Sequence, residues 1–518
     1  MKANFVKVAI GAGLLAATAL AAPTAASAKT LVYCSEGSPE GFNPSLYTAG
    51  TTFDASSRQV FNRLVQFKRG TTTIVPGLAT SWDVSADGTE YTFNLRKGVK
   101  FQTTDAFTPT RDFNADDVIF SFRRQWDKEH PYHPVSGGGY EYFNSMSMGE
   151  LIKDIVKVDD YTVKFVLNRP EAPFIANMAM DFASILSGEY ADQLMAAGTP
   201  EQIDLNPVGT GPFRFESWAR GDNIKLVRQA DYWGKTPALE RVTFKVIDDP
   251  AAQVAALLAG DVDAIPNIGA PETVAQFEAD PRFTVLKGTT EGETILSINH
   301  RRPLLQDVRV RKAIQHAIDR QALIDGAMFG FGTPIGSHFA PHNPAYTDLT
   351  EATPYDPEKA KDLLAQAGVA PGTKLVLKLP PPTYARRGGE IVAAQLKAVG
   401  FDVEQIPVDW GQWVSEVFKG DHDFDLTIVS HTEPLDIGIY ARDDYYFGYD
   451  NPAFKTLMSK IDTVSDPAGR NTLYKEAQRM LADDAANAFL FQLAKVTVQR
   501  KDLKGLWQNA PIQANDMT

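Results

Sequence analysis

The second half of the chain alternates short apolar runs with longer amphipathic segments, and this alternation constrains the fold more than any other feature. The runs at 374–379, 401–408 and 424–430 are typical of strands. Helical segments follow the first two runs, at 388–400 and 411–420. Strands separated by helices of this length predict an α/β unit with a largely parallel sheet. In such sheets, ligands bind beyond the carboxyl ends of the strands.

Two further helical segments precede this unit. Apolar residues recur with helical spacing along 310–318, so the segment 307–328 is predicted to form one long amphipathic helix. A second helix is indicated after Asp356, which stands at the N-cap position and precedes Pro357 at the first helical position. Gly368 stands where that helix should end.

The first half of the chain has the short alternating segments of antiparallel β structure. Residues 81–84 and 90–96 flank Ala-Asp-Gly at 86–88, which is a strong hairpin signal. A second strand pair is expected within 158–170, and Asn114 is expected to cap a helix. A β-rich half followed by an α/β half predicts two lobes that face a cleft.

The N-terminus has the pattern of an export signal. Lys2 and Lys7 precede the apolar run Val8–Ala22, and Ala-Ser-Ala at 26–28 offers a small-residue cleavage site. This pattern predicts a cleaved signal peptide at 1–28 and a soluble mature protein. An uncleaved membrane anchor is the alternative, but the apolar run is short for a membrane span.

The net charge of the chain limits the classes of partner that it can bind. The net charge is −13, and removal of Lys2 and Lys7 with the signal peptide takes it to −15. No basic tract compensates this acidity, which argues against nucleic acid as a partner.

No catalytic motif is recognised in the chain. Neither G-x-S-x-G nor H-E-x-x-H occurs, and the single cysteine, Cys34, lies near the expected mature start. His130 with His133, and His338 with His342, have ligand-like spacing, but prolines between them exclude a helical pair, and no acidic partner stands beside the second pair. We therefore expect no enzyme activity, no metal and no cofactor.

The stretch 430–451 follows the last apolar run and crowds acidic side chains with His431 and several Tyr and Phe rings. Trp410 and Trp413 follow the end of another predicted strand. Rings give large contact area, and charges among them fix orientation. Two strand ends that supply such side chains to one edge predict a recognition site, although some rings are expected to belong to the core. The candidate rings are Trp410, Trp413, Tyr440, Tyr445, Tyr446 and Phe447.

Several segments together resemble a known family. These are PGLATSWDVSADGTEYTFNLRKGVKF (76–101), NADDVIFSF (114–122), NPVGTGPF (206–213), DVRVRKAIQHAID (307–319) and YDPEKAKDLLAQAG (355–368). In this order they resemble the large periplasmic solute-binding proteins of ABC importers, the peptide, opine and nickel class called family 5. The resemblance spans nearly the whole mature chain, and its N-terminal half is most similar to the dipeptide-binding members.

The resemblance implies a bilobal α/β periplasmic binding protein of class II, with two lobes joined by a hinge and an extra N-terminal subdomain. The ligand would be buried between the lobes. The implied divisions are 1–28 for the signal peptide, 29–60 with 191–290 and 490–518 for lobe I, 61–190 for its inserted subdomain, and 291–489 for lobe II.

The resemblance also implies roles for single residues. In dipeptide-binding relatives an aspartate binds the amino group of the ligand, and Asp436 or Glu433 stands at the corresponding place. The loop that carries the relatives' carboxylate-binding arginine is shorter in this chain, where Arg386 or Arg387 would substitute. Trp410 corresponds to the relatives' pocket tryptophan. Trp413, Tyr440, Tyr445 and His431 complete the expected ligand-binding set.

The expected function follows from the family. A monomeric periplasmic receptor would capture a peptide or peptide-like solute and deliver it to ABC permease subunits in the inner membrane. The alternatives are an opine, an oligosaccharide, or a nickel or haem chelate as ligand. An exported carboxylate hydrolase is a further alternative, which the absence of a catalytic motif disfavours.

Overall fold

The computed structural model describes residues 29–433, 435–464, 466–511 and 515–518. The predicted signal peptide, 1–28, lies outside the described residues. Within the described ranges, no helix is both long and apolar enough to cross a membrane.

One mixed sheet runs through the whole molecule. Its long central strands, β12 and β17, pair antiparallel with each other, and β13 pairs with β17 as well. The strand order is β15 (Phe401–Pro407), β14 (Thr373–Leu379), β16 (Leu426–His431), β12 (Phe283–Ile298), β17 (Ala488–Arg500), β11 (Ala264–Ile265), β1 (Thr30–Ser35), β10 (Arg241–Val246), β9 (Asn223–Arg228) and β8 (Phe213–Ala219), with β13 at Gly332–Pro334.

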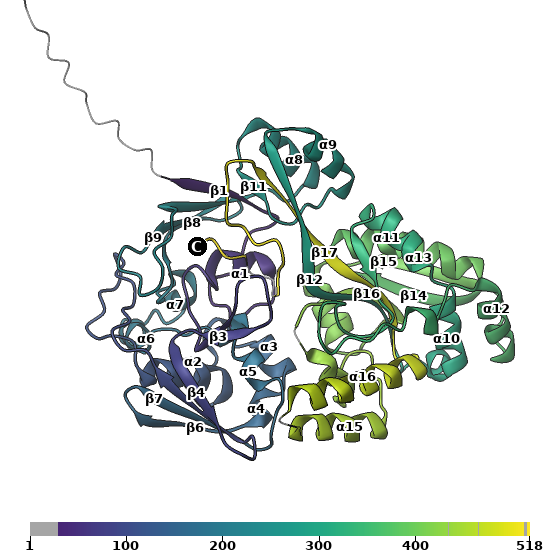
Figure 1. Ribbon diagram of the computed structural model, residues 1–518, viewed down its shortest axis with the longest axis horizontal. Coiled ribbons are helices and arrows are strands. Elements are labelled where there is room, and N and C mark those ends of the chain that lie inside the picture. The colour runs from purple at the N-terminus through teal and green to yellow at the C-terminus, as the bar shows by residue number, and fades with distance from the viewer. Residues whose placement is uncertain (1–28, 434, 465, 512–514) are drawn as a thin grey trace, which may run out of the picture.

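The strands β12 and β17 join two masses of the molecule (Figure 1). We call the mass built on β11, β1, β10, β9 and β8 lobe I, and the mass built on β16, β14 and β15 lobe II. The register between β12 and β17 shifts between Thr289 and Glu293 and again between Thr294 and Ile295. Such irregularities bend and twist a strand pair. The domain limits given above remain proposals.

Lobe II confirms part of the predicted α/β pattern. The strands β14, β15 and β16 are parallel to one another, as expected. The prediction of a largely parallel sheet is wrong for β12 and β17, because β12 pairs antiparallel with both β16 and β17. The helices of lobe II are α10 (Val308–His316), α11 (Arg320–Met328), α12 (Pro357–Gln366), α13 (Thr383–Ala398), α14 (Trp410–Trp413), α15 (Pro452–Thr463) and α16 (Pro467–Asp483).

The predicted long helix at 307–328 is two helices. The helix α10 ends at His316, and the carboxylate of Asp319 accepts a hydrogen bond from the backbone N–H of Ala322, at 3.0 Å, which caps α11. An aspartate at this position competes with helix continuation because it satisfies the free N–H groups of a new first turn. The prediction for Asp356 is confirmed, since it caps α12 through Lys359 N at 2.9 Å.

Two other helices differ from their predicted bounds. The helix α13 begins at Thr383, so Arg386 and Arg387 lie on its first turns. The segment 411–420 continues from α14 as a short π-helix, Val414–Phe418. A π-helical turn widens the backbone locally and is frequent at functional sites.

Lobe I contains a four-stranded antiparallel sheet in the order β4 (Ala79–Val84), β5 (Glu90–Leu95), β7 (Thr162–Leu167) and β6 (Ile152–Asp159). Both predicted hairpins are thereby confirmed. The predicted N-cap role of Asn114 is confirmed: it caps α2, and it does so in a capping box with Asp117. A short pair is formed by β2 (Val65–Phe67) and β3 (Ile74–Pro76). The helices are α1 (Gly50–Ser56), α2 (Ala115–Trp126), α3 (Glu141–Ser145), α4 (Met148–Leu151), α5 (Phe174–Asn177), α6 (Gly188–Ala196), α7 (Gln202–Leu205), α8 (Pro250–Ala259) and α9 (Val274–Ala279).

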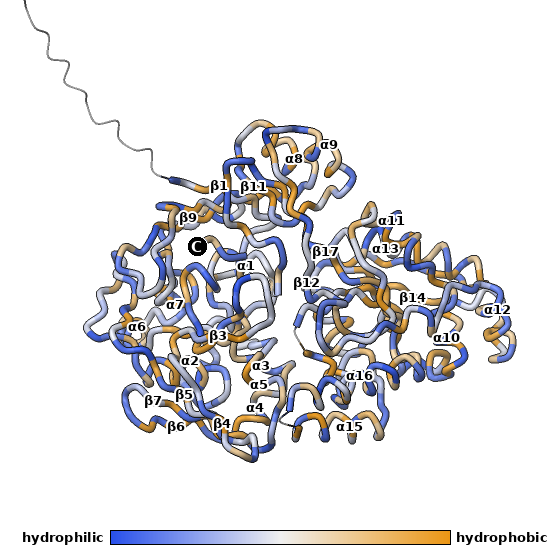
Figure 2. The backbone as a smooth tube through the Cα atoms, in the orientation of Figure 1, coloured by the Kyte–Doolittle hydropathy of each residue, from blue (hydrophilic) through white to orange (hydrophobic). Residues whose placement is uncertain are grey.

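Each lobe has its own hydrophobic core. The hydrophobic segments of the chain lie mainly in the interior of the two lobes (Figure 2). In lobe II, Leu375, Leu377 and Ile428 of the sheet pack against Val392 and Leu396 of α13, and all five are buried. Burial of apolar surface within each lobe makes each of them a compact unit.

Candidate functional site

The site lies beyond the carboxyl ends of β15 and β16. Because both strands are parallel to β14, their carboxyl ends meet at one edge of the sheet. The helix α14 follows β15, and the short 3₁₀ helix η7 (Asp436–Ala441) follows β16. The ring centroids of Trp413 and Tyr446 are 5.8 Å apart, so the two strand ends do supply contacting side chains to this edge.

Most of the predicted rings are in the core. Trp413, Tyr440, Tyr446 and Phe447 are buried. The indole N–H of Trp413 donates to Thr427 Oγ1 at 3.0 Å, which fixes that ring over the sheet. The other two candidate rings are accessible: Trp410 is 43% exposed, and Tyr445 is partly buried.

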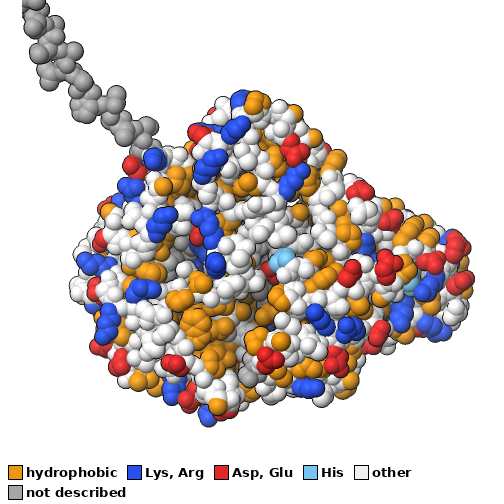
Figure 3. Space-filling model, viewed as in Figure 1, with side chains coloured by type: hydrophobic (Ala, Val, Ile, Leu, Met, Phe, Trp, Pro, Cys, Tyr) orange, Lys and Arg blue, Asp and Glu red, His pale blue; other side chains and the backbone are white. Residues whose placement is uncertain are grey.

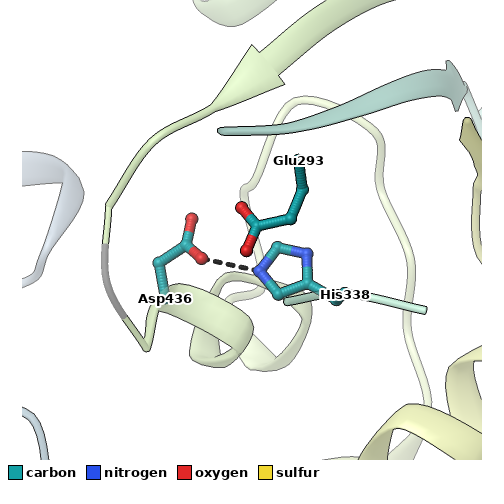
Figure 4. A group of neighbouring side chains, drawn as sticks. All are labelled: Glu293, His338 and Asp436. Carbon is teal, nitrogen blue, oxygen red and sulfur yellow. Dashed lines mark hydrogen bonds and ion pairs between the residues drawn. The ribbon is translucent and has the colours of Figure 1, made fainter. Parts of the chain in front are cut away.

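Beneath these rings lies a cluster of three carboxylates and two histidines, which we call the acidic cluster: Glu293, Glu433, Asp436, His338 and His431. Figure 4 shows the side chains of Glu293, His338 and Asp436 pointing toward one another from three different segments. His338 Nε2 is 2.6 Å from Asp436 Oδ1, and His431 Nδ1 is 3.7 Å from Asp436 Oδ2. Asp436 is therefore the centre of the cluster.

Sheet register brings the cluster together. Glu293 of β12 is the direct antiparallel partner of His431, the last residue of β16. Asp436 begins η7 five positions later, immediately after Leu435, whose backbone has a left-handed φ of 62°. Tyr440 packs edge-on against His338, with ring centroids 5.3 Å apart. His431 Nε2 is 3.1 Å from the hydroxyl oxygen of Tyr446, so the buried rings hold the histidines in place.

Burial and mutual repulsion set the protonation of the cluster. Burial, followed by the nearby charge of Asp436, raises the pKa of Glu293 well above its usual value and raises the pKa of Glu433 as well. Burial also opposes ionisation of Asp436, but His338 beside it outweighs this effect and holds the pKa of Asp436 below its usual value. Burial lowers the pKa of His431 to about 4, so this imidazole is neutral at pH 7.

Three buried atoms of the cluster have no hydrogen-bond partner among the described residues: Glu293 Oε2, His338 Nδ1 and Asp436 Oδ2. A buried polar atom without a partner costs about 1–3 kcal/mol. Glu293 and His338 are 1% and 0% exposed, so bulk water does not reach them freely. The cluster is therefore arranged to receive hydrogen-bond donors or a positive charge.

Lobe I covers the cluster. Tyr142 is the second residue of α3. Its hydroxyl hydrogen-bonds with Glu433. Beside this contact, Lys419 Nζ is 2.5 Å from Glu141 Oε1. Two residues before α5, Ala172 N donates to Asp462 Oδ1 of α15 at 3.4 Å. The acidic cluster thus lies where the lobes close on each other.

A cavity of about 250 Å³ lies between the lobes and reaches Leu435, the neighbour of Asp436. Figure 3 shows the surface hollowed between the lobes, with hydrophobic side chains on the lobe I side of the hollow. The cavity is lined by Thr72, Ile74, Ala172, Ile175 and Ala176 from lobe I, and by Asn343, Pro344, Leu435, Pro467, Arg470, Asn471 and Tyr474 from lobe II.

The two predicted arginines do not join the cluster. Arg386 donates to the carbonyl oxygens of Pro380, at 2.9 Å, and Val408, at 2.7 Å, which ties α13 to the ends of β14 and β15. Arg387 forms a two-point ion pair with Glu272, at 3.0 and 3.1 Å. Both guanidinium groups are already engaged away from Asp436.

Sequence reasoning missed two residues of the site, Glu293 and Tyr142. Glu293 had one available signal, because it is a charged residue at the start of an otherwise apolar strand segment. Tyr142 had none. No acidic residue stands beside His338 and His342 in the sequence, but the fold supplies one to each. Asp436 lies against His338, and Glu291 hydrogen-bonds with His342.

The cluster contains two groups that could hold a metal ion. One is Glu293, His338 and Asp436, and the other is His431, Glu433 and Asp436. In each group, one ligand atom per residue lies within 4.8 Å of the others. Imidazole and carboxylate are suitable ligands for zinc, nickel and similar divalent ions.

Comparison with known proteins places this site in context. The family model described as "Bacterial extracellular solute-binding proteins, family 5 Middle" matches residues 73–438. The chain is 40% identical over 516 residues to the dipeptide-binding protein of Escherichia coli, covering 96% of this chain and 95% of that one. It is 39% identical over 490 residues to heme-binding protein A of Haemophilus influenzae, covering 90% and 88%. The solved structure of a Pseudoalteromonas dipeptide-binding protein in complex with Met-Leu superposes with a TM-score of 0.86 at 31% identity, covering 94% of this chain and 99% of that one.

Proposed function

Since the chain belongs to family 5 of the bacterial extracellular solute-binding proteins, we propose that it binds a small solute with a cationic amino group, such as a peptide, between its lobes. The solute is then delivered to the permease subunits of an ABC transporter. The protein acts by binding alone, as a monomer, in the periplasm after removal of its signal peptide.

The unpaired carboxylate oxygens of the acidic cluster carry this proposal. Within the described part of the chain, the buried atoms Glu293 Oε2 and Asp436 Oδ2 have no hydrogen-bond partner. Glu433 stands at the lobe interface. A primary ammonium group brings one positive charge and three N–H donors, which suits such a set of acceptors. In a site shielded from water, this pairing is stronger than at the surface.

In this proposal, binding of the ligand is coupled to closure of the two lobes. Tyr142 of lobe I reaches Glu433 of lobe II only when the lobes are together. A cation bound at Asp436 removes the penalty of placing carboxylates in a closed interface, so the ligand favours the closed form by its differential affinity. A permease can then distinguish loaded from empty receptor by shape.

A peptide ligand is supported by the relatives, of which one is named a dipeptide-binding protein and one was solved with Met-Leu. We assign the amino group to Asp436 and Glu433, and wall contacts to Trp410 and Tyr445. The anionic end is assigned to Arg470, because this arginine lines the interlobe cavity, where its Nη1 donates to Ala172 O at the long distance of 3.4 Å. Arg386 and Arg387 are engaged in shorter contacts elsewhere.

A metal chelate is the second candidate ligand. Two overlapping groups of imidazole and carboxylate ligands meet at Asp436, and one relative is named for heme binding. In this case the metal of the chelate, in place of an ammonium group, would occupy the centre of the cluster.

A thermal-shift screen of ligand-free mature protein separates the two candidates. The panel contains di- and tripeptides, opines, oligosaccharides, and nickel and haem chelates. A ligand at 100 times its dissociation constant adds about 2.7 kcal/mol to the free energy of unfolding. We expect this response from peptides. A response to chelates alone would favour the second candidate, and a response to neutral sugars alone would contradict both.

A further inference from the structure

We propose that lobe I carries a second binding site, for a small tetrahedral oxyanion such as phosphate or sulfate. It lies in a cavity next to α1 that we call the arginine cavity. This site is separate from the acidic cluster and shares no lining residue with the interlobe cavity. It does not depend on which solute the receptor transports.

The arginine cavity has a volume of about 120 Å³. One water needs only ~10–15 Å³ by this measure, so the cavity has room for a polyatomic ion. Its lining is dominated by positive charge and hydrogen-bond donors. The residues are Arg58, Asn62, Arg63, Gln66, Pro212, Tyr232, Lys235, Asp516 and Thr518.

Two buried guanidinium groups in this lining are incompletely paired. Arg58 is 6% exposed and Arg63 is 2% exposed. The Nε and Nη2 groups of Arg58 and the Nε group of Arg63 have no acceptor among the described residues. The large majority of buried side-chain polar atoms in native proteins are hydrogen-bonded, so three unpaired N–H groups on two neighbouring arginines of one cavity indicate a missing acceptor.

The contacts that these arginines do make compensate their charges only in part. Arg63 Nη1 donates to Ser57 Oγ at 2.7 Å, and Arg58 stacks over the ring of Trp507, 4.7 Å from its centroid. The carboxylate of Asp516 is 3.9 Å from Arg58 Nη1, too far for a hydrogen bond.

The charge balance of the cavity points the same way. Arg58, Arg63 and Lys235 supply three positive charges to the lining, whereas Asp516 supplies one negative charge. Asp181 lies behind the cavity, where it accepts a hydrogen bond from the Ser57 hydroxyl. With Asp181 counted, the side chains named here leave one positive charge. Arg69, which also repels Arg58, donates to the main-chain oxygen of Thr518 at 3.3 Å.

The pKa directions agree with this imbalance. Burial lowers the pKa of Arg58, and burial together with repulsion from Arg58 lowers the pKa of Arg63 to about 10. Arginines held by carboxylates show the opposite direction in this protein, as with Arg111 beside Asp117. An oxyanion between the two guanidinium groups would reverse the shift.

The geometry favours a tetrahedral oxyanion over other anions. A guanidinium group presents a planar fork of donors that matches two oxygens of a phosphate or sulfate. Two such forks with Lys235 can contact four oxygens from different sides. Tyr232 adds a hydroxyl donor, because its oxygen already accepts from Asn62 Nδ2 at 3.4 Å.

The test is titration of the mature protein with sodium phosphate and, separately, with sodium sulfate, against sodium chloride at equal ionic strength. Binding is followed by calorimetry and by the melting temperature. We expect saturable binding of phosphate or sulfate. The two arms identify the preferred ion, and chloride accounts for general screening.

Three variants locate the site. Arg58→Gln should weaken oxyanion binding by about 10-fold or more, since it removes charged donors. Lys235→Ala, at an exposed position that does not endanger folding, should weaken it several-fold. The matched control Lys361→Ala removes an exposed lysine of α12 and should leave oxyanion binding unchanged.

Dipeptide affinity should be unchanged in Lys235→Ala, which separates this site from the proposed function. Responses to phosphate and sulfate no larger than to chloride, or wild-type oxyanion affinity in Lys235→Ala, would overturn the proposal.

Discussion

The acidic cluster and the arginine cavity both contain buried polar atoms without partners, but they differ in charge and in position. The cluster is built from β12, β16, η7 and the segment after β13, and lobe I covers it through Tyr142. The arginine cavity is lined by lobe I and by the C-terminal residues Asp516 and Thr518. We therefore expect a ligand in the cluster to act on lobe closure, and an ion in the cavity to act on the stability of lobe I.

The largest expected effect is on solute affinity when the centre of the cluster is neutralised. Asp436→Asn keeps the size of the side chain but removes its charge, leaving the cation of the ligand without its main partner. We expect a loss of about 2–5 kcal/mol in binding, measured by calorimetry. Asp444→Asn is the matched control, because Asp444 is exposed in the same stretch. Equal affinities of the two variants would contradict the assignment of Asp436.

The next effect is the pH dependence of stability. His431 has a pKa of about 4 in the folded protein, against an ordinary value of 6.5. Between these values the unfolded chain binds a proton that the folded chain does not, so the free energy of unfolding falls as pH falls from 6.5 to 4. The contribution is on the order of 3 kcal/mol.

Chemical denaturation at several pH values measures this slope. The variant His431→Gln should flatten it, although His300, whose pKa is also lowered to about 4 by burial, should keep part of the slope. An unchanged slope in His431→Gln would show that His431 is accessible to protons in the folded state. The arginine cavity predicts no such dependence, since its arginines keep their charge throughout this pH range.

A smaller effect is expected where lobe I meets the cluster. Tyr142→Phe removes the hydroxyl that hydrogen-bonds with Glu433 and leaves the ring in place. We expect solute affinity to fall by about 1–2 kcal/mol, because the closed form loses one charge-assisted hydrogen bond. Oxyanion binding in lobe I should be unaffected. A parallel loss of both activities would mean that the substitution disturbs lobe I as a whole.

The smallest effect is expected for Arg387→Gln. Arg387 and Glu272 are 40% and 38% exposed at their side chains, and surface pairs of this kind contribute about 0–1 kcal/mol. Solute affinity and melting temperature should therefore stay close to wild type. A loss comparable to that of Asp436→Asn would return Arg387 to the ligand site.

The sequence predicted features that depend on neighbours along the chain. Asn114 and Asp356 cap their helices as expected, and β16 ends at His431, within one residue of the start of the acidic stretch. Local competition also explains an error: Asp319 can cap a new helix, and it divides the predicted long helix in two. Capping chemistry is readable from sequence, but the choice between continuing and restarting a helix depends on packing.

The parts of the site that sequence did not reveal depend on long-range pairing. Glu293 meets His431 through the register of β12 with β16, and His338 meets Asp436 across 98 positions of the chain. Tyr142 reaches Glu433 only because two lobes close. No local pattern encodes such contacts. The sequence around His338 and His342 therefore does not reveal their acidic partners, Asp436 and Glu291.

The most direct test of the central claim is calorimetric titration of the wild-type protein with one dipeptide and with its N-acetylated form. Acetylation removes the ammonium charge and changes little else at that end of the ligand. We predict that the free peptide binds and that acetylation weakens binding by at least ~100-fold, because a buried carboxylate loses its charged partner. Equal affinity for the two forms would show that the acidic cluster does not bind the amino group, and would contradict the account.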